Sequence, residues 1–380
     1  MLYLHSKLPA TGTTIFTVMS QLAAETGAIN LSQGFPDYDC DPELTELVVS
    51  SFKAGHNQYA PMAGVMKLRE RIAEKNELLY QAQYNPDSEI TVTAGGTQAL
   101  FSAIGSTIRP DDEVIVFEPA YDSYAPAVRL FGGVVKTFKL DPPYKIDWDN
   151  VKKAINSHTR MIILNSPNNP TGSILKQKDI DQLIRITKGT DILILSDEVY
   201  EHLIYDGEKH LSMALFPELA ERSFICASFG KLLHTTGWKI GYCLAPAALM
   251  TEFRKVHQYE VFSVNTPLQH AIADYLKDEE VYLRLLGFFQ EKRDFFRKLM
   301  NETKFDLLPC SGSYFQMASY KNVSNEPDFD LAMRLTRDFG VASIPESAFY
   351  SSKTDHGLLR FCFAKKQETL EKAVERLLKF

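Results

Sequence analysis

The sequence predicts an α/β fold, with a mostly parallel sheet in a large domain and a smaller α+β domain after it. Three observations carry this prediction. Short apolar runs recur along the chain, helix-length segments separate them, and the pattern changes after about residue 285. Continuous apolar runs of this kind suit parallel strands that helices cover on both faces.

Four apolar runs define the expected parallel strands, and each is followed by polar or glycine residues. They are residues 114–117 before EPAYDSY, 161–164 before NSPNNPTG, 192–195 before SDEVYEH and 224–227 before SFGK. Ligands of such sheets bind beyond the carboxyl ends of the strands. We therefore expect these four polar segments to converge on a single site.

An earlier segment, EITVTAGGTQALFSAI, alternates like a strand and then becomes helical after Gly95, Gly96 and Thr97. A glycine turn that opens a helix presents free backbone N–H groups and the positive end of the helix dipole. It can therefore hold a phosphate group. The same turn also occurs for purely structural reasons, so the motif alone leaves both interpretations open.

The C-terminal part is expected to form the smaller domain. Residues 282–301 read as a helix, SYFQMASY and LLRFCFA as strands with the helical LAMRLTRDFG between them, and ETLEKAVERLLKF as a closing helix. We divide the chain into an N-terminal segment that packs with the small domain (1–45), a large domain (46–285) and a small domain (286–380).

The composition of the chain limits the kinds of ligand that it is expected to bind. The 380 residues are 45% hydrophobic and carry a formal charge of −7 with a pI near 5.8, so no basic excess is present to bind nucleic acid or an anionic membrane. No apolar run approaches the roughly 20 residues that span a bilayer, and the start lacks a secretory pattern. The five cysteines are scattered without CxxC spacing. We expect a cytoplasmic protein that acts on a small metabolite and holds no metal.

Polar residues at the strand ends are the first candidate site residues. Asp197 ends a buried strand, where an ionised carboxylate is costly unless it is paired or hydrogen-bonded. It could be a structural cap, but Tyr200 and Lys231 are expected nearby. Asn165 directly follows another apolar run, so its amide should point toward the same site. Arg360 interrupts an apolar strand and needs a bidentate acceptor, either an internal carboxylate or that of a substrate.

Five motifs in this order and spacing carry a family resemblance: GGTQAL, EPAYDSY, NSPNNPTG, SDEVYE and SFGKLLHTTGWKIGY. The chain resembles the class I pyridoxal-phosphate-dependent aminotransferases of fold type I over nearly its whole length. SKLPATGTTIFTVMS, INLSQGFPDYD, NQYAPMAGVMKLRE and KVHQYEVFSVNTP bring it closest to bacterial methionine aminotransferase and the branch with kynurenine aminotransferase and glutamine transaminase K.

The resemblance implies pyridoxal 5'-phosphate as the cofactor and assigns the catalytic roles. Lys231 matches the lysine that forms the Schiff base, and Asp197 matches the carboxylate that pairs with the pyridine nitrogen. Tyr200 and Asn165 match the donors to the phenolic oxygen of the ring, and Tyr121 matches the aromatic residue stacked on it. Lys231 must be deprotonated to act as a nucleophile, and we expect desolvation and a nearby positive charge to favour that form.

The resemblance also assigns the phosphate and carboxylate contacts. The phosphate pocket corresponds to Gly96, Thr97, Gln98, Ser228 and Lys239, with Tyr59 contributed by the second subunit of a homodimer. The residues that match the family's groups for binding the substrate carboxylate are Arg360, Asn169 and the backbone of Gly34. Asn169 also matches a residue at the cofactor. One position departs from the family pattern, because Leu232 stands where relatives carry a hydroxyl residue after the lysine.

The expected reaction is a ping-pong transfer of an amino group from an amino acid to a 2-oxo acid. Aromatic and apolar residues in 3–16 and 262–265, with Tyr59 and Tyr121, should favour neutral side chains, and no second arginine is placed to receive a side-chain carboxylate. Methionine is the best candidate, followed by phenylalanine, tyrosine, glutamine and kynurenine. Two alternatives stay open: a cysteine-conjugate β-lyase, and a regulatory module that keeps the fold and the cofactor.

Overall fold

A seven-stranded sheet forms the centre of the large part of the molecule in the computed structural model, which describes residues 4–9 and 11–380. The strand order is β2-β8-β7-β6-β5-β3-β4, and only β8 runs antiparallel to its neighbours. The strands are β2 (Ile90–Thr93), β3 (Glu113–Glu118), β4 (Val134–Lys139), β5 (Thr159–Asn165), β6 (Leu193–Asp197), β7 (Ser223–Ser228) and β8 (Gly241–Leu244).

The four predicted parallel strands are confirmed as β3, β5, β6 and β7, which lie side by side. Successive side chains of a strand point to opposite faces of its sheet. In β3, Val114 and Val116 therefore pack into one buried cluster, whereas Ile115 packs into the other. Both faces of the sheet are covered, which is why these strands read as continuous apolar runs.

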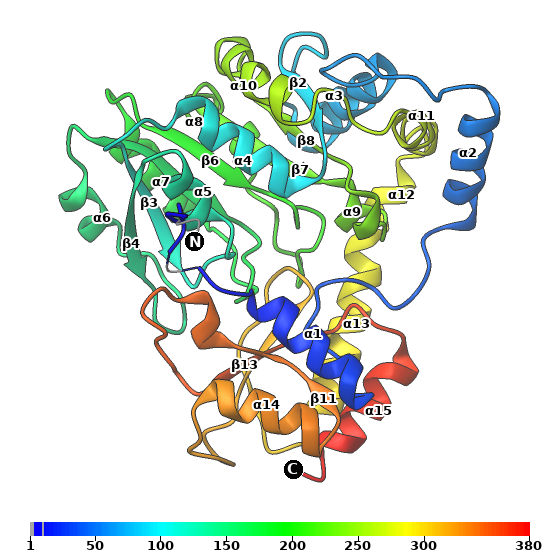
Figure 1. Cartoon of the computed structure of the whole chain (residues 1–380), viewed down its shortest axis with the longest axis vertical. Coiled ribbons are helices and arrows are strands. Elements are labelled where there is room, and N and C mark those ends of the chain that lie inside the picture. Colours follow the sequence, from blue (N-terminus) through cyan, green and yellow to red (C-terminus); the bar gives the residue numbers. More distant parts are fainter. Residues whose placement is uncertain (1–3, 10) are drawn as a thin grey trace.

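Helices supply the two covering layers. The layer that packs on Val114 and Val116 contains α4 (Gly96–Thr107), α5 (Tyr124–Leu130) and α10 (Ala247–Glu260). The opposite layer contains α3 (Met66–Tyr80), α6 (Trp148–Ala154), α7 (Gln177–Thr187), η1 (Met213–Leu215), α8 (Pro217–Ala220) and α9 (Phe229–Leu232). The short helix η2 (Thr236–Trp238) follows α9, and α2 (Pro42–Lys53) packs on α11 (Thr266–Tyr275) at one margin of the molecule (Figure 1).

The C-terminal part contains a second, antiparallel sheet with the order β12-β13-β10-β9. Its strands are β9 (Asp306–Leu307), β10 (Phe315–Ser319), β12 (Ile344–Pro345) and β13 (Leu358–Cys362), and its helices are α12 (Glu280–Leu283), α13 (Leu285–Met300), α14 (Asp328–Asp338), η3 (Glu346–Phe349) and α15 (Gln367–Leu377). Both predicted strands and the three predicted helices are confirmed, although the first helix is divided at Arg284.

The N-terminal segment lies along this smaller part. Helix α1 (Ile15–Thr26) packs against α14, and β1 (Ile29–Asn30) pairs in parallel with β11 (Val341–Ala342). Figure 1 shows α1 in front of β13 and beside α14. The division of the chain at residues 45 and 285 stays a prediction. In the part of the chain that the structure describes, no helix is long and apolar enough to cross a membrane.

Candidate active site

The carboxyl ends of the parallel strands bring the predicted polar residues together. Asn165 is the last residue of β5 and Asp197 the last of β6, and their Cα atoms are ladder partners. Ser228 ends β7, and Gly96 begins α4 directly after β2. Because parallel strands end at one edge of a sheet, residues far apart in sequence become neighbours there.

These residues line one cavity of about 310 Å³. It contains twelve of the fourteen predicted site residues: Gly34, Gly96, Thr97, Tyr121, Asn165, Asn169, Asp197, Tyr200, Ser228, Lys231, Lys239 and Arg360. Six further residues complete the lining: Phe16, Gln33, Leu100, Val199, Thr236 and Phe315. The predicted convergence of the four segments that follow the apolar strands is therefore confirmed, because each of them contributes residues to this cavity.

Lys231 lies on α9 and presents its amine at this cavity. Its Nζ donates to the carbonyl oxygen of Gly34 at 2.9 Å and to the hydroxyl of Tyr314 at 2.8 Å. The pKa of Lys231 is lowered to about 8, mainly by desolvation; the positive charges of Lys239 and Arg360 act in the same direction, and Cys362 and Asp197 oppose them. The amine is therefore deprotonated far more readily than a surface lysine, as the sequence predicts.

Asp197 is buried, and its carboxylate is held by two donors. The hydroxyl of Tyr124 donates to Oδ2 at 2.5 Å, and the backbone N–H of Val199 donates to Oδ1 at 3.3 Å. Burial raises the pKa of Asp197 to about 6, and these two hydrogen bonds oppose the rise. Asp197 therefore remains ionised at neutral pH inside an apolar setting, where it can pair strongly with a cationic ring nitrogen.

Asn165 and Tyr200 flank these two groups. Asn165 accepts from the backbone N–H of Asn169 at 2.8 Å and donates one Nδ2 hydrogen to the carbonyl of Asp197 at 2.9 Å. An amide nitrogen carries two hydrogens, so one is left for a ligand. The ring of Tyr200 is buried and lies 5.6 Å from the amine of Lys231.

The turn before α4 forms a cradle of backbone N–H groups. Gly95 has a φ of 82°, and a Cβ on Gly96 would approach Cγ1 of Val199 to 2.9 Å. Both positions therefore need glycine. The first N–H groups of α4 have no intrahelical acceptor, and Lys239 and Ser228 line the cavity beside them. Positive charge and free N–H donors make this end of the cavity suited to a phosphate.

Arg360 lies at the other end of the cavity and is fully buried. Nη1 donates to Oδ1 of Asn169 at 2.6 Å, Nη2 donates to the carbonyl of Ser32 at 2.5 Å, and the guanidinium stacks on Phe315 at 3.8 Å. Burial lowers its pKa to about 10. No carboxylate of the described chain forms an ion pair with it, and its Nε has no hydrogen-bond partner there. This favours a substrate carboxylate over an internal one.

Two predicted residues do not line the cavity. The side chain of Gln98 is held elsewhere: its Oε1 accepts from the N–H of Ala94 at 2.9 Å, and its Nε2 bonds Ser102 at 2.6 Å and His257 at 3.1 Å. Only the backbone N–H of Gln98 could act in the helix cradle. Tyr59 is 81% exposed and packs edge-on against Phe262.

Several residues of the site were not predicted. Tyr124 and Tyr314 contact Asp197 and Lys231 directly, but the sequence analysis assigned neither of them a role. For Tyr124 the signal was present in the motif EPAYDSY. In the region expected to set specificity, Phe16 and Tyr121 line the cavity, whereas residue 3 lies outside the described residues. Leu232 packs into the main core.

A buried ion pair involves Glu201, which directly follows the cavity residue Tyr200 in the sequence. Nζ of Lys75 lies 2.7 Å from Oε1 of Glu201, and Tyr80 donates to the other carboxylate oxygen at 2.6 Å. The hydroxyl of Tyr242 lies 3.1 Å from Oε1. Burial alone would raise the pKa of Glu201, but Lys75, His202 and the hydrogen bond from Tyr80 together more than offset this, so the pKa falls to about 2. This cluster joins α3 and β8 to the loop that carries Tyr200.

Comparison with known proteins settles the family. A family model described as aminotransferase class I and II matches residues 26–377. The chain belongs to this family. A methionine aminotransferase of Escherichia coli K12 is 50% identical over 375 residues, covering 98% of this chain and 97% of that protein. Human kynurenine–oxoglutarate transaminase 3 is 33% identical over 394 residues, covering 95% of this chain and 87% of that protein.

Solved structures agree with this assignment. A crystal structure from Escherichia coli, reported with a methionine aminotransferase function, superposes with a TM-score of 0.97 at 49% identity over 100% of both chains. An aspartate aminotransferase of Thermus thermophilus with maleate gives 0.90 at 29% identity, again over 100% of both chains. The aminotransferase thus has the fold type I architecture predicted from its sequence, and a regulatory module or a β-lyase is not favoured.

Proposed function

We propose that this aminotransferase uses pyridoxal 5'-phosphate to move the amino group of a neutral sulfur-containing or aromatic amino acid to a 2-oxo acid. Methionine is the first candidate donor, because the relative that is 50% identical bears that name. Phenylalanine, tyrosine, glutamine and kynurenine are further candidates. The observation that carries the proposal is the amine of Lys231, with its lowered pKa, in one cavity with Asp197 and Arg360.

The residues of the cavity fit the cofactor. Lys231 offers an amine, Asp197 a buried carboxylate and Tyr121 an aromatic wall, and the α4 cradle with Lys239 suits the phosphate. The glycine at position 96 is explained by packing, because a Cβ there would lie 2.9 Å from Cγ1 of Val199; the feature that fits the phosphate is the set of free N–H groups at the start of α4. When bound, pyridoxal phosphate supplies an aldehyde that reacts with amines and a ring that accepts electrons from the substrate Cα.

The side chains divide the remaining work. Asp197 would stabilise a proton on the pyridine nitrogen of the cofactor, because an ion pair is strong where water is scarce. Lys231 in its neutral form would take a proton from the substrate Cα and deliver it to the cofactor carbon that carried the aldehyde, and the second half of the cycle would run the same transfer in reverse. The guanidinium of Arg360, with Asn169, binds the substrate carboxylate as a fixed fork and thereby orients the Cα.

Substrate preference follows from the rest of the lining. Phe16, Leu100 and Phe315 add apolar surface, and Arg360 is the one arginine among the described lining residues. A side-chain carboxylate would therefore lack a guanidinium partner, so aspartate should be a poor donor. A change of one methylene in an apolar pocket alters binding by only about 1–3 kcal/mol. Several neutral amino acids should therefore serve.

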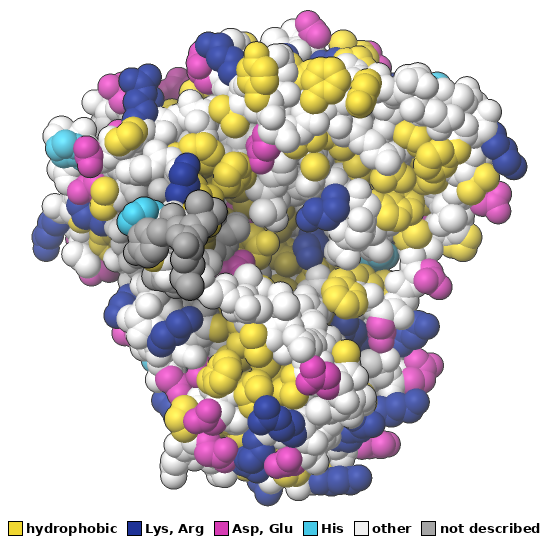
Figure 2. All heavy atoms as spheres, in the orientation of Figure 1, with side chains coloured by type: hydrophobic (Ala, Val, Ile, Leu, Met, Phe, Trp, Pro, Cys, Tyr) yellow, Lys and Arg dark blue, Asp and Glu magenta, His cyan; other side chains and the backbone are white. Residues whose placement is uncertain are grey.

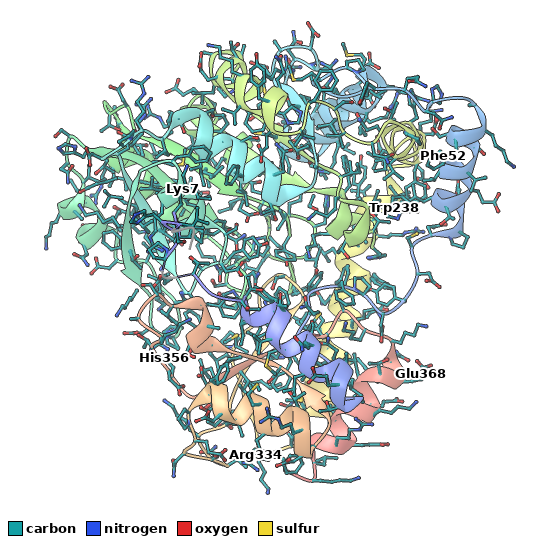
Figure 3. The ribbon with its side chains drawn as sticks, viewed as in Figure 1. Lys7, Phe52, Trp238, Arg334, His356 and Glu368 are labelled. Carbon is teal, nitrogen blue, oxygen red and sulfur yellow. The ribbon has the colours of Figure 1, made fainter. Side chains whose placement is uncertain are left out.

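We also propose a homodimer with shared active sites. Tyr59 and Phe262 pack edge-on against each other although they are 81% and 52% exposed, and Tyr259, three residues before Phe262 in the sequence, is 87% exposed. Figure 2 shows hydrophobic side chains gathered over the region of α2, α10 and α11, and Figure 3 places the half-exposed Phe52 on α2 at the same margin. From there Tyr59 would reach the phosphate of the partner. Sedimentation that finds a fully loaded, active monomer would refute this.

Absorbance spectra test the function directly. The purified protein should be yellow, and a panel of amino acids should convert the aldehyde form to the amine form, with methionine among the fastest. Borohydride reduction followed by peptide mapping should place the cofactor on Lys231. A label on another residue would contradict the proposal. Release of thiol, ammonia and pyruvate from a cysteine conjugate measures any β-lyase side activity.

The cytoplasmic location stays a prediction that cell fractionation can check.

A further inference from the structure

We infer that Tyr314 is a positioning residue for Lys231: together with the carbonyl of Gly34, its hydroxyl holds the free amine and directs its lone pair away from both oxygens. The inference rests on the proposed function, in which that amine takes the proton from the substrate. Tyr314 is buried and does not line the cavity, so it would act through Lys231 and not on the substrate.

The three groups form a closed set of hydrogen bonds. Nζ of Lys231 donates to the carbonyl of Gly34 at 2.9 Å and to the hydroxyl of Tyr314 at 2.8 Å. The hydroxyl of Tyr314 in turn donates to the same carbonyl. The hydroxyl is therefore fixed as an acceptor toward Lys231, because its own hydrogen is already committed to Gly34.

This arrangement sets the direction of the amine. A neutral amine has two N–H donors and one lone pair, and both donors are used by the oxygens of Gly34 and Tyr314. The lone pair must occupy the remaining tetrahedral position, on the far side from these oxygens. A base held in this way starts each proton transfer correctly oriented, which is a main source of catalytic rate.

The surroundings of Gly34 and Tyr314 hold the two acceptors rigidly. A Cβ on Gly34 would lie 2.7 Å from Cζ of Phe315 and 3.2 Å from Cε2 of Tyr314, so the carbonyl can sit there only on a glycine. The ring of Tyr314 packs edge-on against Tyr200 at 5.1 Å and against Phe315 at 5.0 Å.

The contact also links distant parts of the chain. Lys231 belongs to α9 beneath the large sheet, Tyr314 directly precedes β10 of the small sheet, and Gly34 lies in the N-terminal segment after β1. The direction of the amine therefore depends on how these parts are packed together. A displacement of the small sheet would remove one acceptor from the amine.

Tyr314→Phe tests the inference because it removes only the hydroxyl. Tyr320→Phe is the matched control, since Tyr320 is also buried, follows the same strand and donates to a backbone carbonyl, that of Glu326, at 2.8 Å. With each protein loaded with cofactor, the absorbance change on mixing with methionine and with α-deuterated methionine gives the rate and the isotope effect. For Tyr314→Phe we expect kcat to fall about tenfold or more, KM to stay within about twofold and the isotope effect to rise.

A second readout uses the cofactor-free protein. The pH dependence of the reaction of Lys231 with an amine-specific reagent, followed by mass spectrometry of its peptide, reports its pKa. Asp197, Lys239, Arg360 and Cys362 influence this pKa and are unchanged in the variant. The pKa should fall in Tyr314→Phe, because the ammonium form loses an acceptor, and should not move in Tyr320→Phe.

The outcomes distinguish a failure of the role of Tyr314 from a failure of the proposed function. An unchanged rate, isotope effect and labelling profile in Tyr314→Phe, or equal losses in Tyr320→Phe, would overturn the role of Tyr314. If Tyr314→Phe does not fold, Tyr314→Met removes the same hydroxyl and is judged by the same criteria. If the parent protein shows no spectral change with any amino acid, the proposed function fails instead, while the labelling profile still tests the contact.

Discussion

Tyr124 donates its hydroxyl to Oδ2 of Asp197 at 2.5 Å, and both side chains are buried. The hydrogen bond joins the start of α5 to the end of β6. It opposes the rise in the pKa of Asp197 that burial causes. Tyr124 therefore helps to keep the carboxylate ionised where the proposed cofactor needs a negative charge.

Removing this donor should make Asp197 easier to protonate. In Tyr124→Phe we expect the pKa of Asp197 to rise above about 6, and cofactor affinity at neutral pH to fall by about 1.5–3 kcal/mol, the value of a hydrogen bond to a charged group. Cofactor dissociation constants measured by absorbance against pH check this. Tyr350→Phe is the control, because it removes a buried donor to the carbonyl of Leu140 instead. Equal affinities in parent and Tyr124→Phe would contradict the role.

The raised pKa of Asp197 also predicts a pH dependence of stability. Its folded pKa of about 6 exceeds the ordinary value of 3.8, so the folded state binds this proton more tightly than the unfolded state. The stabilisation is complete below about pH 3.8 and is lost as the pH rises through about 6. By linkage it amounts to about 3 kcal/mol.

Asp197→Asn removes this titration. In the cofactor-free protein, the free energy of unfolding of the parent should fall relative to that of Asp197→Asn between about pH 4 and pH 6. Urea unfolding at a series of pH values measures this difference. A difference that stays constant with pH would show that Asp197 does not titrate in this range.

The pKa of Lys231 should respond to Lys239. Because the positive charge of Lys239 contributes to the lowering to about 8, Lys239→Gln should raise this pKa. The rate at which the cofactor-free protein captures pyridoxal rises with pH and then levels off. In Lys239→Gln it should level off at a higher pH than in the parent. Pyridoxal is used because it has no phosphate, so a lost phosphate contact does not interfere. Lys255→Gln, at the surface on α10, should leave the profile unchanged.

Arg360 should not be replaceable by lysine. Its two Nη atoms donate in different directions, to Asn169 and to Ser32, which a single ammonium cannot reproduce. For Arg360→Lys we expect the KM values of both the amino acid and the 2-oxo acid to rise about 10–100-fold. Steady-state kinetics with each substrate varied in turn measures this. Unchanged KM values would place the substrate carboxylate elsewhere.

The buried pair of Lys75 and Glu201 should matter far more than a surface pair. Glu201→Gln leaves a buried ammonium without its counter-ion and should cost about 3–5 kcal/mol of folding free energy. Glu252→Gln breaks the exposed pair with Lys255 at 2.6 Å and should cost under about 1 kcal/mol. Chemical unfolding of both variants compares them. Similar losses would show that the buried pair is not a structural element of the site.

Most of the large sheet could be predicted from the sequence, because the signal of a covered parallel strand is local. The four apolar runs became β3, β5, β6 and β7, and the residues at their ends became the site. β8 was not predicted, since nothing in GYCL shows that it runs antiparallel between β2 and β7. The side chain of Gln98 turned toward α10 for a similar reason, because its partners come from another helix.

By itself the sequence determined the reaction class, because the order and spacing of five local motifs, GGTQAL to SFGKLLHTTGWKIGY, resemble those of one family of enzymes. Only the tertiary structure decided the charge state and the orientation of the side chains in these motifs. The partners that set the charge of Asp197 and the direction of Lys231, namely Tyr124, Tyr314 and Gly34, lie 73 to 197 positions away along the chain. A hydrogen bond of a few ångströms between such positions exists only once the elements that carry them have packed.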